Sequence, residues 1–197
     1  MSDRMTRPLV LIAAFAGSLA AGLLVVLWLA GGFRGVTTAA SIGGAFQLTD
    51  QSGQTVTEQN LKGKPTLIFF GFTHCPDICP TSLFEISEVL RALGKDADRI
   101  NAWFVSVDPE RDTAAAMKDY LSSFDPHLKG LTGNEAATAK VISSFRVYAK
   151  KVPTKDGDYT MDHTALIYLM DRDGRFIAPF NLKRKPEEAA AELKRYL

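Results

Sequence analysis

The order of apolar and polar segments predicts a three-layer α/β sandwich with a mixed sheet, preceded by one transmembrane helix. Three observations lead to this prediction. Apolar runs at residues 66–70, 100–107 and 165–170 indicate buried strands, and segments with helical periodicity separate them. This order, closed by a hairpin and a helix, is typical of a sheet covered on both faces. A separate uncharged run at residues 9–30 lies outside this pattern.

The N-terminal segment is expected to anchor the chain in a membrane. A helix over residues 9–30 would be about 30 Å long, which is enough to cross a bilayer. Arg4 and Arg7 precede it, so residues 1–8 should stay in the cytoplasm and the later residues should lie across the membrane. A cleaved signal peptide is the alternative, because residues 38–40 are small, but the apolar run is longer than a typical signal-peptide core.

The domain itself is expected at residues 44–197, after a flexible tether. Residues 31–43 are rich in Gly, Ala, Thr and Ser, which is the composition of a flexible linker. The first element of the domain should be a small hairpin at residues 46–56, where the hydrophobic pattern alternates around a turn. The chain has a net charge of only +1, which argues against nucleic acid as a partner.

The first core strand, at residues 66–70, is apolar on both faces and should therefore be central in the sheet. A helix should follow, with Ser82 and Glu85 in the pattern of a capping box. After a second buried strand at residues 100–107, Asp112 is in position to cap another helix. These signals predict a strand, helix, strand and helix in succession.

The second half of the domain continues in the same way. Thr132 and Glu135 have the pattern of a further helix start, and an edge strand is expected at residues 146–152. The strand at residues 165–170 is followed by a hairpin turn and a returning strand, and Pro186 suits the first position of a closing helix.

Both cysteines of the chain lie in the sequence Gly-Phe-Thr-His-Cys-Pro-Asp-Ile-Cys-Pro at residues 71–80, directly after the first core strand. Such a pair can form a disulfide, shuttle electrons as a dithiol or bind a soft metal ion. An oxidising compartment favours the disulfide. Because a proline follows each of Cys75 and Cys79, we expect both on the turn before the helix. The helix N-terminus should lower their pKa values.

Two of the three histidines are not strong candidates for a site. His74 flanks Cys75 on the turn, where it would be exposed or would tune the thiol. His127 lies in a loop far from any motif and is expected to be solvated.

His163 lies in the segment Asp162-His163-Thr164, which directly precedes the strand at residues 165–170. If that strand neighbours the first core strand, the imidazole can approach the two cysteines; the alternative is a loop histidine hydrogen-bonded to Asp162 or Thr164. Two thiolates and one imidazole suit Cu(I), and also Cu(II) if a water or carboxylate joins them. Structural zinc normally takes four protein ligands, and iron–sulfur clusters normally need four cysteines, so both fit this set poorly.

Three separated motifs resemble the Sco/SenC family. They are the cysteine segment at residues 71–80, Ser-Val-Asp-Pro-Glu-Arg-Asp-Thr at residues 106–113 and Asp-His-Thr-Ala-Leu-Ile-Tyr-Leu-Met-Asp at residues 162–171. Family members are membrane-tethered, thioredoxin-fold copper proteins that assist assembly of the CuA centre of cytochrome c oxidase. The resemblance covers essentially the whole predicted domain and implies a thioredoxin-like fold.

The resemblance further implies that Cys75, Cys79 and His163 are the copper ligands, and that oxidation of the cysteine pair alternates with metal loading. The implied partners are the CuA-bearing subunit of cytochrome c oxidase, a copper-donor protein and a thiol reductant. Two positions depart from the common family pattern: Thr164 stands where Ser is frequent, and Arg172 where Pro is frequent. Neither is an implied ligand.

Other residues of these motifs have two interpretations. Asp77 lies between the cysteines, and the resemblance implies a role beside the ligands or in docking a partner, although a turn residue is also expected there. Asp108, Glu110, Arg111 and Asp112 belong to the second motif, but their chemistry indicates a turn and a helix cap with an arginine ion pair.

Two functions stay open on this basis. The first is a copper metallochaperone, which is not an enzyme; the second is a dedicated thiol–disulfide reductase or redox sensor acting on the cysteines of the acceptor. A general thioredoxin-type reductase has two residues between its cysteines and, by resemblance, a cis-proline opposite them. Here three residues separate the cysteines and residues 162–165 contain no proline, which favours the metal.

The expected location is the inner membrane of a bacterium, with the domain in the periplasm. A mitochondrial inner membrane with the domain facing the intermembrane space is the alternative, but the short N-terminus lacks an Arg-rich, Ser-rich presequence.

Overall fold

The computed structural model describes residues 15–26 and 42–197. The contacts divide the chain into two units, Met1–Ala40 and Ser41–Leu197. Residues 15–26 of the first unit are helical. Within the described residues no helix has the length and apolar character needed to cross a membrane. The expected cytoplasmic segment, both ends of the expected anchor and most of the expected tether lie outside the described residues.

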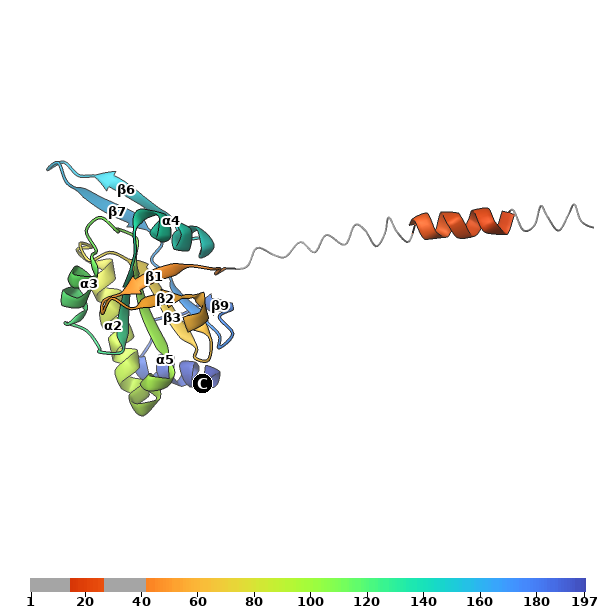
Figure 1. The fold of residues 1–197 in the computed structure, drawn as a ribbon. Helices are drawn as coiled ribbons and strands as arrows, with labels where there is room; N and C mark the ends of the chain where they lie inside the picture. The colour runs from red at the N-terminus through yellow and green to blue at the C-terminus, as the bar shows by residue number, and fades with distance from the viewer. Residues whose placement is uncertain (1–14, 27–41) are drawn as a thin grey trace, which may run out of the picture. The chain divides into compact units, whose positions relative to one another are not determined.

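A seven-stranded mixed sheet forms the centre of the second unit (Figure 1). Its strand order is β2-β1-β5-β4-β3-β8-β9. The strands are β1 (Gln47–Asp50), β2 (Thr55–Thr57), β3 (Thr66–Gly71), β4 (Asn101–Ser106), β5 (Leu128–Thr132), β8 (Ile167–Met170) and β9 (Phe176–Pro179). β3 pairs in parallel with β4 and antiparallel with β8. The strand that follows His163 is therefore a direct neighbour of the first core strand.

Helices surround this sheet. They are α2 (Ile78–Leu93), α3 (Ala114–Leu121), α4 (Glu135–Ser144) and α5 (Pro186–Leu193), with short 3-10 helices η1 (Glu58–Leu61), η2 (Gly94–Arg99) and η3 (Lys194–Tyr196). α2 packs against α5, and α3 packs against β5. Pro186 occupies the first turn of α5, as predicted, because its missing N–H costs nothing there.

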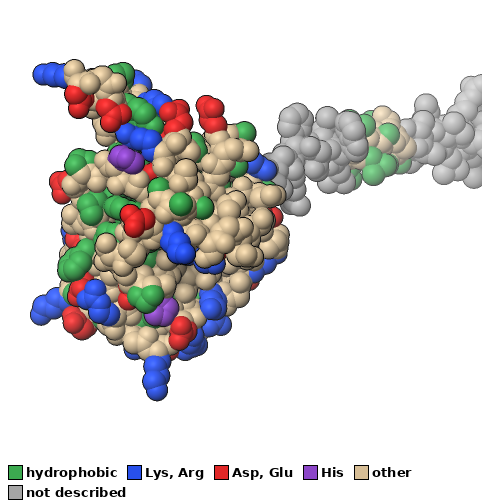
Figure 2. Space-filling model, turned by 60° about the vertical axis from the view of Figure 1, so that its left-hand side comes forward, with side chains coloured by type: hydrophobic (Ala, Val, Ile, Leu, Met, Phe, Trp, Pro, Cys, Tyr) green, Lys and Arg blue, Asp and Glu red, His purple; other side chains and the backbone are tan. Residues whose placement is uncertain are grey.

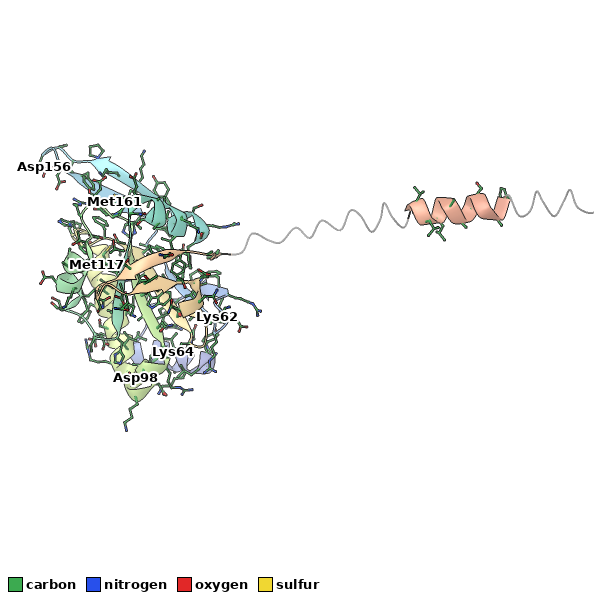
Figure 3. The ribbon with its side chains drawn as sticks, viewed as in Figure 1. Lys62, Lys64, Asp98, Met117, Asp156 and Met161 are labelled. Carbon is green, nitrogen blue, oxygen red and sulfur yellow. The ribbon has the colours of Figure 1, made fainter. Side chains whose placement is uncertain are left out.

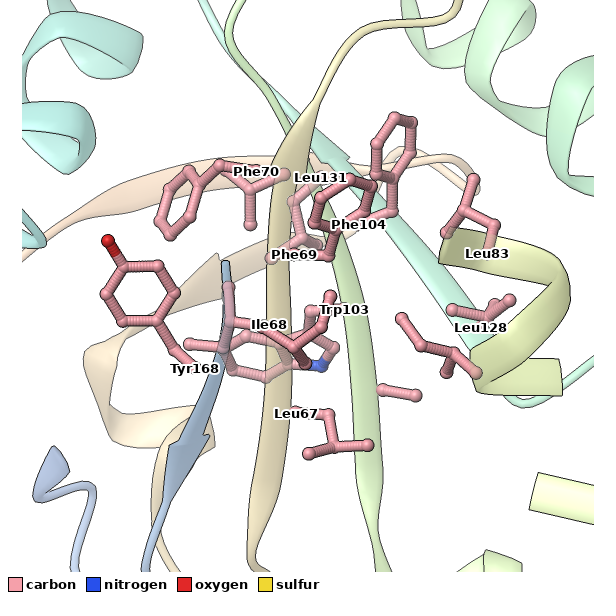
Figure 4. Packing of buried hydrophobic residues seen from close by; sticks show 14 of the residues in the cluster. Leu67, Ile68, Phe69, Phe70, Leu83, Trp103, Phe104, Leu128, Leu131 and Tyr168 are labelled. Atoms are coloured by element: carbon pink, nitrogen blue, oxygen red, sulfur yellow. The ribbon is translucent and has the colours of Figure 1, made fainter. Parts of the chain in front are cut away.

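The core lies on both faces of β3, whose residues are all buried. Phe69 stacks on Phe104 with ring centroids 5.8 Å apart, whereas Phe70 contacts Phe145 at 5.4 Å and Tyr168 at 5.5 Å. Figure 4 shows these two neighbouring side chains beside their different partners. Successive residues of a strand point to opposite faces, so the two-sided apolar pattern predicted a central strand correctly. β3 thus provides a fixed platform for the segment that follows it.

α2 begins earlier than predicted. Its first residue is Ile78, so Cys79 and Pro80 lie in its first turn and the pattern at Ser82 is not a cap. Proline is tolerated there because the first N–H groups of a helix have no intrahelical acceptor. The prediction that both cysteines lie on the turn before the helix is therefore wrong for Cys79.

The caps of the next two helices also differ from the prediction. Thr113, and not Asp112, caps α3, and Asn134, and not Thr132, caps α4. Asp112 and Thr132 are instead buried, and the Thr132 hydroxyl donates to the backbone carbonyl of Asp112 at 2.6 Å. Several residues with capping side chains stand close together in both segments, and burial decides which of them is available to cap.

Two strands were not predicted, β5 and β7 (Tyr159–His163). The strand expected at residues 146–152 is β6 (Ala149–Pro153), and it pairs with β7 in a separate two-stranded sheet rather than at the edge of the main sheet. Figure 1 shows this hairpin projecting from the domain, and Figure 3 places Asp156 at its free end. His163 is therefore the last residue of a strand.

Acidic and basic side chains are interspersed over the face of the domain shown in Figure 2. Many charged side chains of the domain form ion pairs at its surface, such as Lys183 with Glu85 at 2.9 Å and Arg99 with Asp96 at 3.1 Å. Exposed pairs of this kind contribute at most about 1 kcal/mol each. The fold therefore depends mainly on its apolar core.

Gly71 ends β3 directly beneath the first turn of α2. A Cβ at this position would lie 2.8 Å from the Cys79 Sγ and 2.7 Å from the Phe104 Cε2. Gly71→Ala should therefore overpack the junction and lower the free energy of unfolding by about 1–3 kcal/mol. Urea denaturation of the reduced protein measures this effect, and an unchanged midpoint would contradict the packing described.

Candidate metal centre

Cys75, Cys79 and His163 meet beyond the carboxyl end of β3. Their potential ligand atoms, two sulfurs and one ring nitrogen, all lie within 4.8 Å of one another. The Cys79 Sγ is 3.5 Å from the His163 Nε2, and the Cys79 N–H donates to the Cys75 Sγ at 3.4 Å. Metal–sulfur and metal–nitrogen bonds of 2.0–2.3 Å put the ligands of a three-coordinate ion about 4 Å apart. A small inward movement would therefore give the spacing of a metal site.

Three different elements supply these side chains. Cys75 lies on the turn after β3, where its N–H donates to the Phe72 carbonyl at 3.3 Å. Cys79 lies in the first turn of α2, and its sulfur occupies the space that the missing side chain of Gly71 leaves free. His163 ends β7. Both cysteines are free thiols and buried, while His163 is partly buried.

The orientation of the His163 ring is defined by its surroundings. Its Nδ1 lies 3.1 Å from the backbone carbonyl of Thr164, and since a carbonyl only accepts, Nδ1 carries the proton. Nε2 then presents its lone pair towards the Cys79 sulfur. The rings of Phe72 and Phe69 pack against the imidazole at centroid distances of 5.7 and 6.3 Å. A ligand histidine normally has such a second hydrogen bond, which selects its tautomer.

Burial raises the pKa of the Cys79 thiol, and the neighbouring Cys75 and Asp112 add to this effect. The expectation that the helix N-terminus lowers the pKa of this thiol is therefore wrong, because desolvation of the thiolate outweighs the helix dipole. Without a metal, burial therefore favours the protonated form of the Cys79 thiol. A coordinating metal ion would replace the thiol proton and stabilise the thiolate.

Asp112 holds the cysteine loop in place, a role that the sequence did not reveal. Its carboxylate is buried and accepts hydrogen bonds from the Thr73 N–H at 3.2 Å, the Thr73 hydroxyl at 2.6 Å and the Ser106 hydroxyl at 2.6 Å. Burial raises the pKa of Asp112, and these hydrogen bonds oppose that shift. The only available signal was its place in the motif at residues 106–113, where a helix cap was an equally good explanation.

The predicted arginine ion pair is present beside this anchor. The Arg111 Nε donates to the Asp108 Oδ2 at 2.6 Å. Arg111 also donates to the backbone carbonyl of Tyr159 at 3.0 Å, and its guanidinium lies 3.8 Å from the centroid of the Tyr159 ring. Tyr159 was not among the predicted site residues, because it lies 48 positions away from Arg111 in the sequence.

The remaining candidates lie outside the cluster. His74 is exposed, and its Nδ1 is 3.0 Å from the Thr73 hydroxyl. Asp77 is exposed too; it is the N-cap residue of α2, but its side chain makes no capping hydrogen bond. Neither joins Cys75, Cys79 and His163 within the described part of the chain.

His127 differs from the prediction of a simply solvated side chain. Its Nδ1 lies 2.7 Å from Asp125 and its Nε2 lies 3.2 Å from Asp98. The hydrogen bond to Asp125 is the main cause that raises the pKa of His127. This histidine therefore belongs to a local ion-pair group.

Comparison with known proteins gives matches over most of the chain. A SCO2-like protein of Rickettsia conorii is 44% identical over 149 residues, which cover 75% of this chain and 73% of the relative. A mitochondrial SCO2 homologue of Danio rerio is 40% identical over 157 residues, covering 78% of this chain and 56% of that protein.

Solved structures of Sco proteins are similar to this chain as well. A copper-bound ScoI of Bradyrhizobium japonicum is 81% identical with a TM-score of 0.79, and the match covers 80% of this chain and 100% of that chain. A copper-bound ScoI of Arabidopsis thaliana is 37% identical with a TM-score of 0.72, covering 79% and 98% respectively. These likenesses confirm the predicted thioredoxin-like α/β fold with a mixed sheet. The model of one family, SCO1/SenC, matches residues 34–197, and since this match spans the whole domain with all three residues of the cluster, the chain belongs to the SCO1/SenC family.

Proposed function

We propose that the protein is a copper metallochaperone that binds copper through Cys75, Cys79 and His163 and assists assembly of the CuA centre of cytochrome c oxidase. The convergence of two thiols and one imidazole within 4.8 Å carries the proposal. Thiolates are soft ligands that select Cu(I), and imidazole suits copper as well. Copper-bound structures of homologous Sco proteins support the same assignment. The CuA acceptor is implied by the family resemblance.

The burial of the three ligands suggests how copper would leave the site. Cys79 is completely buried and Cys75 is 9% exposed, so an acceptor must approach from the side of Cys75 and the partly buried His163. An acceptor thiolate would add to the copper ion there, and Cu(I) tolerates such changes between few-coordinate arrangements. Each thiolate of the protein then recovers a proton as its bond to copper breaks. This ligand exchange transfers the ion without a chemical conversion of a substrate, so the protein would not act as an enzyme.

We infer that the domain, residues 44–197, works at a membrane surface. The uncharged run at residues 9–30 would anchor it in an inner membrane, and residues 31–43 would be the tether. The domain would face the periplasm, or the intermembrane space in a mitochondrion. An anchored domain needs a tether of this kind to reach a membrane-bound oxidase subunit.

A thiol–disulfide reductase is the second candidate, and the two free thiols favour it. The Cys75 thiolate would attack a disulfide of the acceptor and release one acceptor thiolate. Cys79 would then attack the mixed disulfide, leaving the Cys75–Cys79 disulfide and a reduced acceptor. Cys79 fits the second step only, because it is buried and its thiol pKa is raised.

Cu(I) titration against a competing chelator tests the copper assignment. The reduced fragment of residues 44–197 contains the main sheet and the cluster, and it should bind one ion per chain. His163→Ala removes one of three ligands and should weaken binding at least about ten-fold. His127→Ala is the matched control, since His127 lies outside the cluster and should not change the affinity. Failure to bind, or equal affinity in the His163→Ala fragment, would contradict the proposal.

Thiol counting separates the two functions. The copper-loaded fragment is mixed with a dithiol peptide, and in a parallel experiment the reduced, copper-free fragment is mixed with the same peptide as a disulfide. The chaperone should transfer copper in the first experiment without loss of thiols. A reductase should instead lose two thiols per chain in the second experiment, and should do so rapidly. Rapid reduction without copper transfer would favour the second candidate.

A further inference from the structure

The strand that carries His163 does not belong to the main sheet. β7 pairs only with β6, in a two-stranded sheet of its own among the described strands. A two-stranded hairpin by itself is marginally stable in water. The position of His163 relative to the cysteines is therefore set by the short link of residues 164–166 to β8, which pairs with β3, and by contacts between this hairpin and the rest of the domain.

One face of β7 makes those contacts. Tyr159, Met161 and His163 alternate along the strand, so their side chains point to the same face. Met161 packs against the core, and Figure 3 shows it nearer to the domain than the tip of the hairpin. His163 reaches Cys79 at one end of this face. Tyr159 at the other end is the second point of attachment.

Tyr159 is held by the loop that follows β4. Its hydroxyl donates to the Asp108 Oδ1 at 2.8 Å, its carbonyl accepts from Arg111 at 3.0 Å, and its ring lies on the Arg111 guanidinium. Asp108 is 1% exposed and pairs with Arg111 at 2.6 Å. Hydrogen bonds to charged groups are stronger than neutral ones, particularly away from water. These contacts of Tyr159 should therefore contribute more stabilising free energy than an exposed ion pair does.

The same loop holds the cysteines. Asp112, one residue after Arg111, accepts the hydrogen bonds of Thr73 in the cysteine loop. The Ser106 hydroxyl joins the two attachments, because it donates to Asp112 at 2.6 Å and accepts from the Asp108 N–H at 3.0 Å. We call residues 106–112 the bracket loop. The cysteine loop, which carries the two sulfurs, and β7, which carries the imidazole, are therefore both hydrogen-bonded to this one short segment.

We propose that Arg111 and Tyr159 are positioning residues for His163, which hold β7 on the bracket loop so that the imidazole faces the two sulfurs. This inference rests on the proposed role of His163 as a copper ligand. Neither residue belongs to the ligand cluster; both act through the strand that carries the imidazole. The bracket loop would thereby set the distance between the two cysteine sulfurs and the His163 imidazole.

Copper affinity in a double-mutant cycle tests the proposal. Tyr159→Ala removes the ring and the hydroxyl and should weaken Cu(I) binding about ten-fold, whereas Tyr159→Phe keeps the ring on Arg111 and should lose less. Thr160→Ala is the matched control, because Thr160 is the next residue and points to the opposite face of β7. In a His163→Ala background, Tyr159→Ala should have no further effect. An equal loss in both backgrounds would overturn the proposal.

A metal-free measurement separates this proposal from the copper assignment. In the reduced fragment, the rings of His163 and Phe72 are 5.7 Å apart between centroids and should give a nuclear Overhauser effect between their protons. This signal should weaken in Tyr159→Ala and persist in Thr160→Ala. Unchanged signals in Tyr159→Ala would overturn the positioning role. If the wild-type fragment bound no copper, a weakened signal would still support the positioning while the copper assignment failed.

Discussion

The buried carboxylate of Asp112 is the contact on which the site depends. The carboxylate joins the cysteine loop, through Thr73, to the end of β4, through Ser106. The backbone carbonyl of the same residue accepts from the hydroxyl of Thr132 and so adds β5. Burying an ionisable group away from water costs folding free energy unless hydrogen-bond donors pair with its oxygen atoms. Here hydroxyl and amide groups are those donors. Each carboxylate oxygen accepts from one hydroxyl and also lies 3.2 Å from the Thr73 N–H, so Thr73 and Ser106 together fix the position of the carboxylate.

Long apolar patterns predicted the fold well, and short polar strands were missed. The run at β3 is apolar at nearly every position, and a strand of that kind has few alternatives to the centre of a sheet. β5 contains Lys129 and Gly130, and β7 contains Thr160 and Asp162, so neither shows a clean apolar run. Such strands form because an adjacent strand of the same protein provides backbone hydrogen-bond partners. The presence of that neighbour is a property of the whole fold and not of the local sequence.

The three ligands could be predicted from the sequence by their chemistry, but the contacts that hold them in position could not. Two cysteines and one histidine are a recognisable donor set wherever they occur in the chain. The contacts that position them join residues 39 positions apart, for Thr73 and Asp112, and 51 positions apart, for Asp108 and Tyr159. The pKa of Cys79 shows a similar limit. The helix N-terminus is visible in the sequence, whereas the burial that outweighs it appears only after the chain has folded.

X-ray absorption at the copper edge of the Cu(I)-loaded fragment tests the central claim most directly, because it counts the atoms bound to the metal. The account predicts two sulfur ligands and one imidazole nitrogen in the wild-type protein. The nitrogen should disappear in the His163→Ala fragment while both sulfurs stay. A wild-type spectrum without an imidazole contribution, or one that His163→Ala leaves unchanged, would contradict a site built from Cys75, Cys79 and His163.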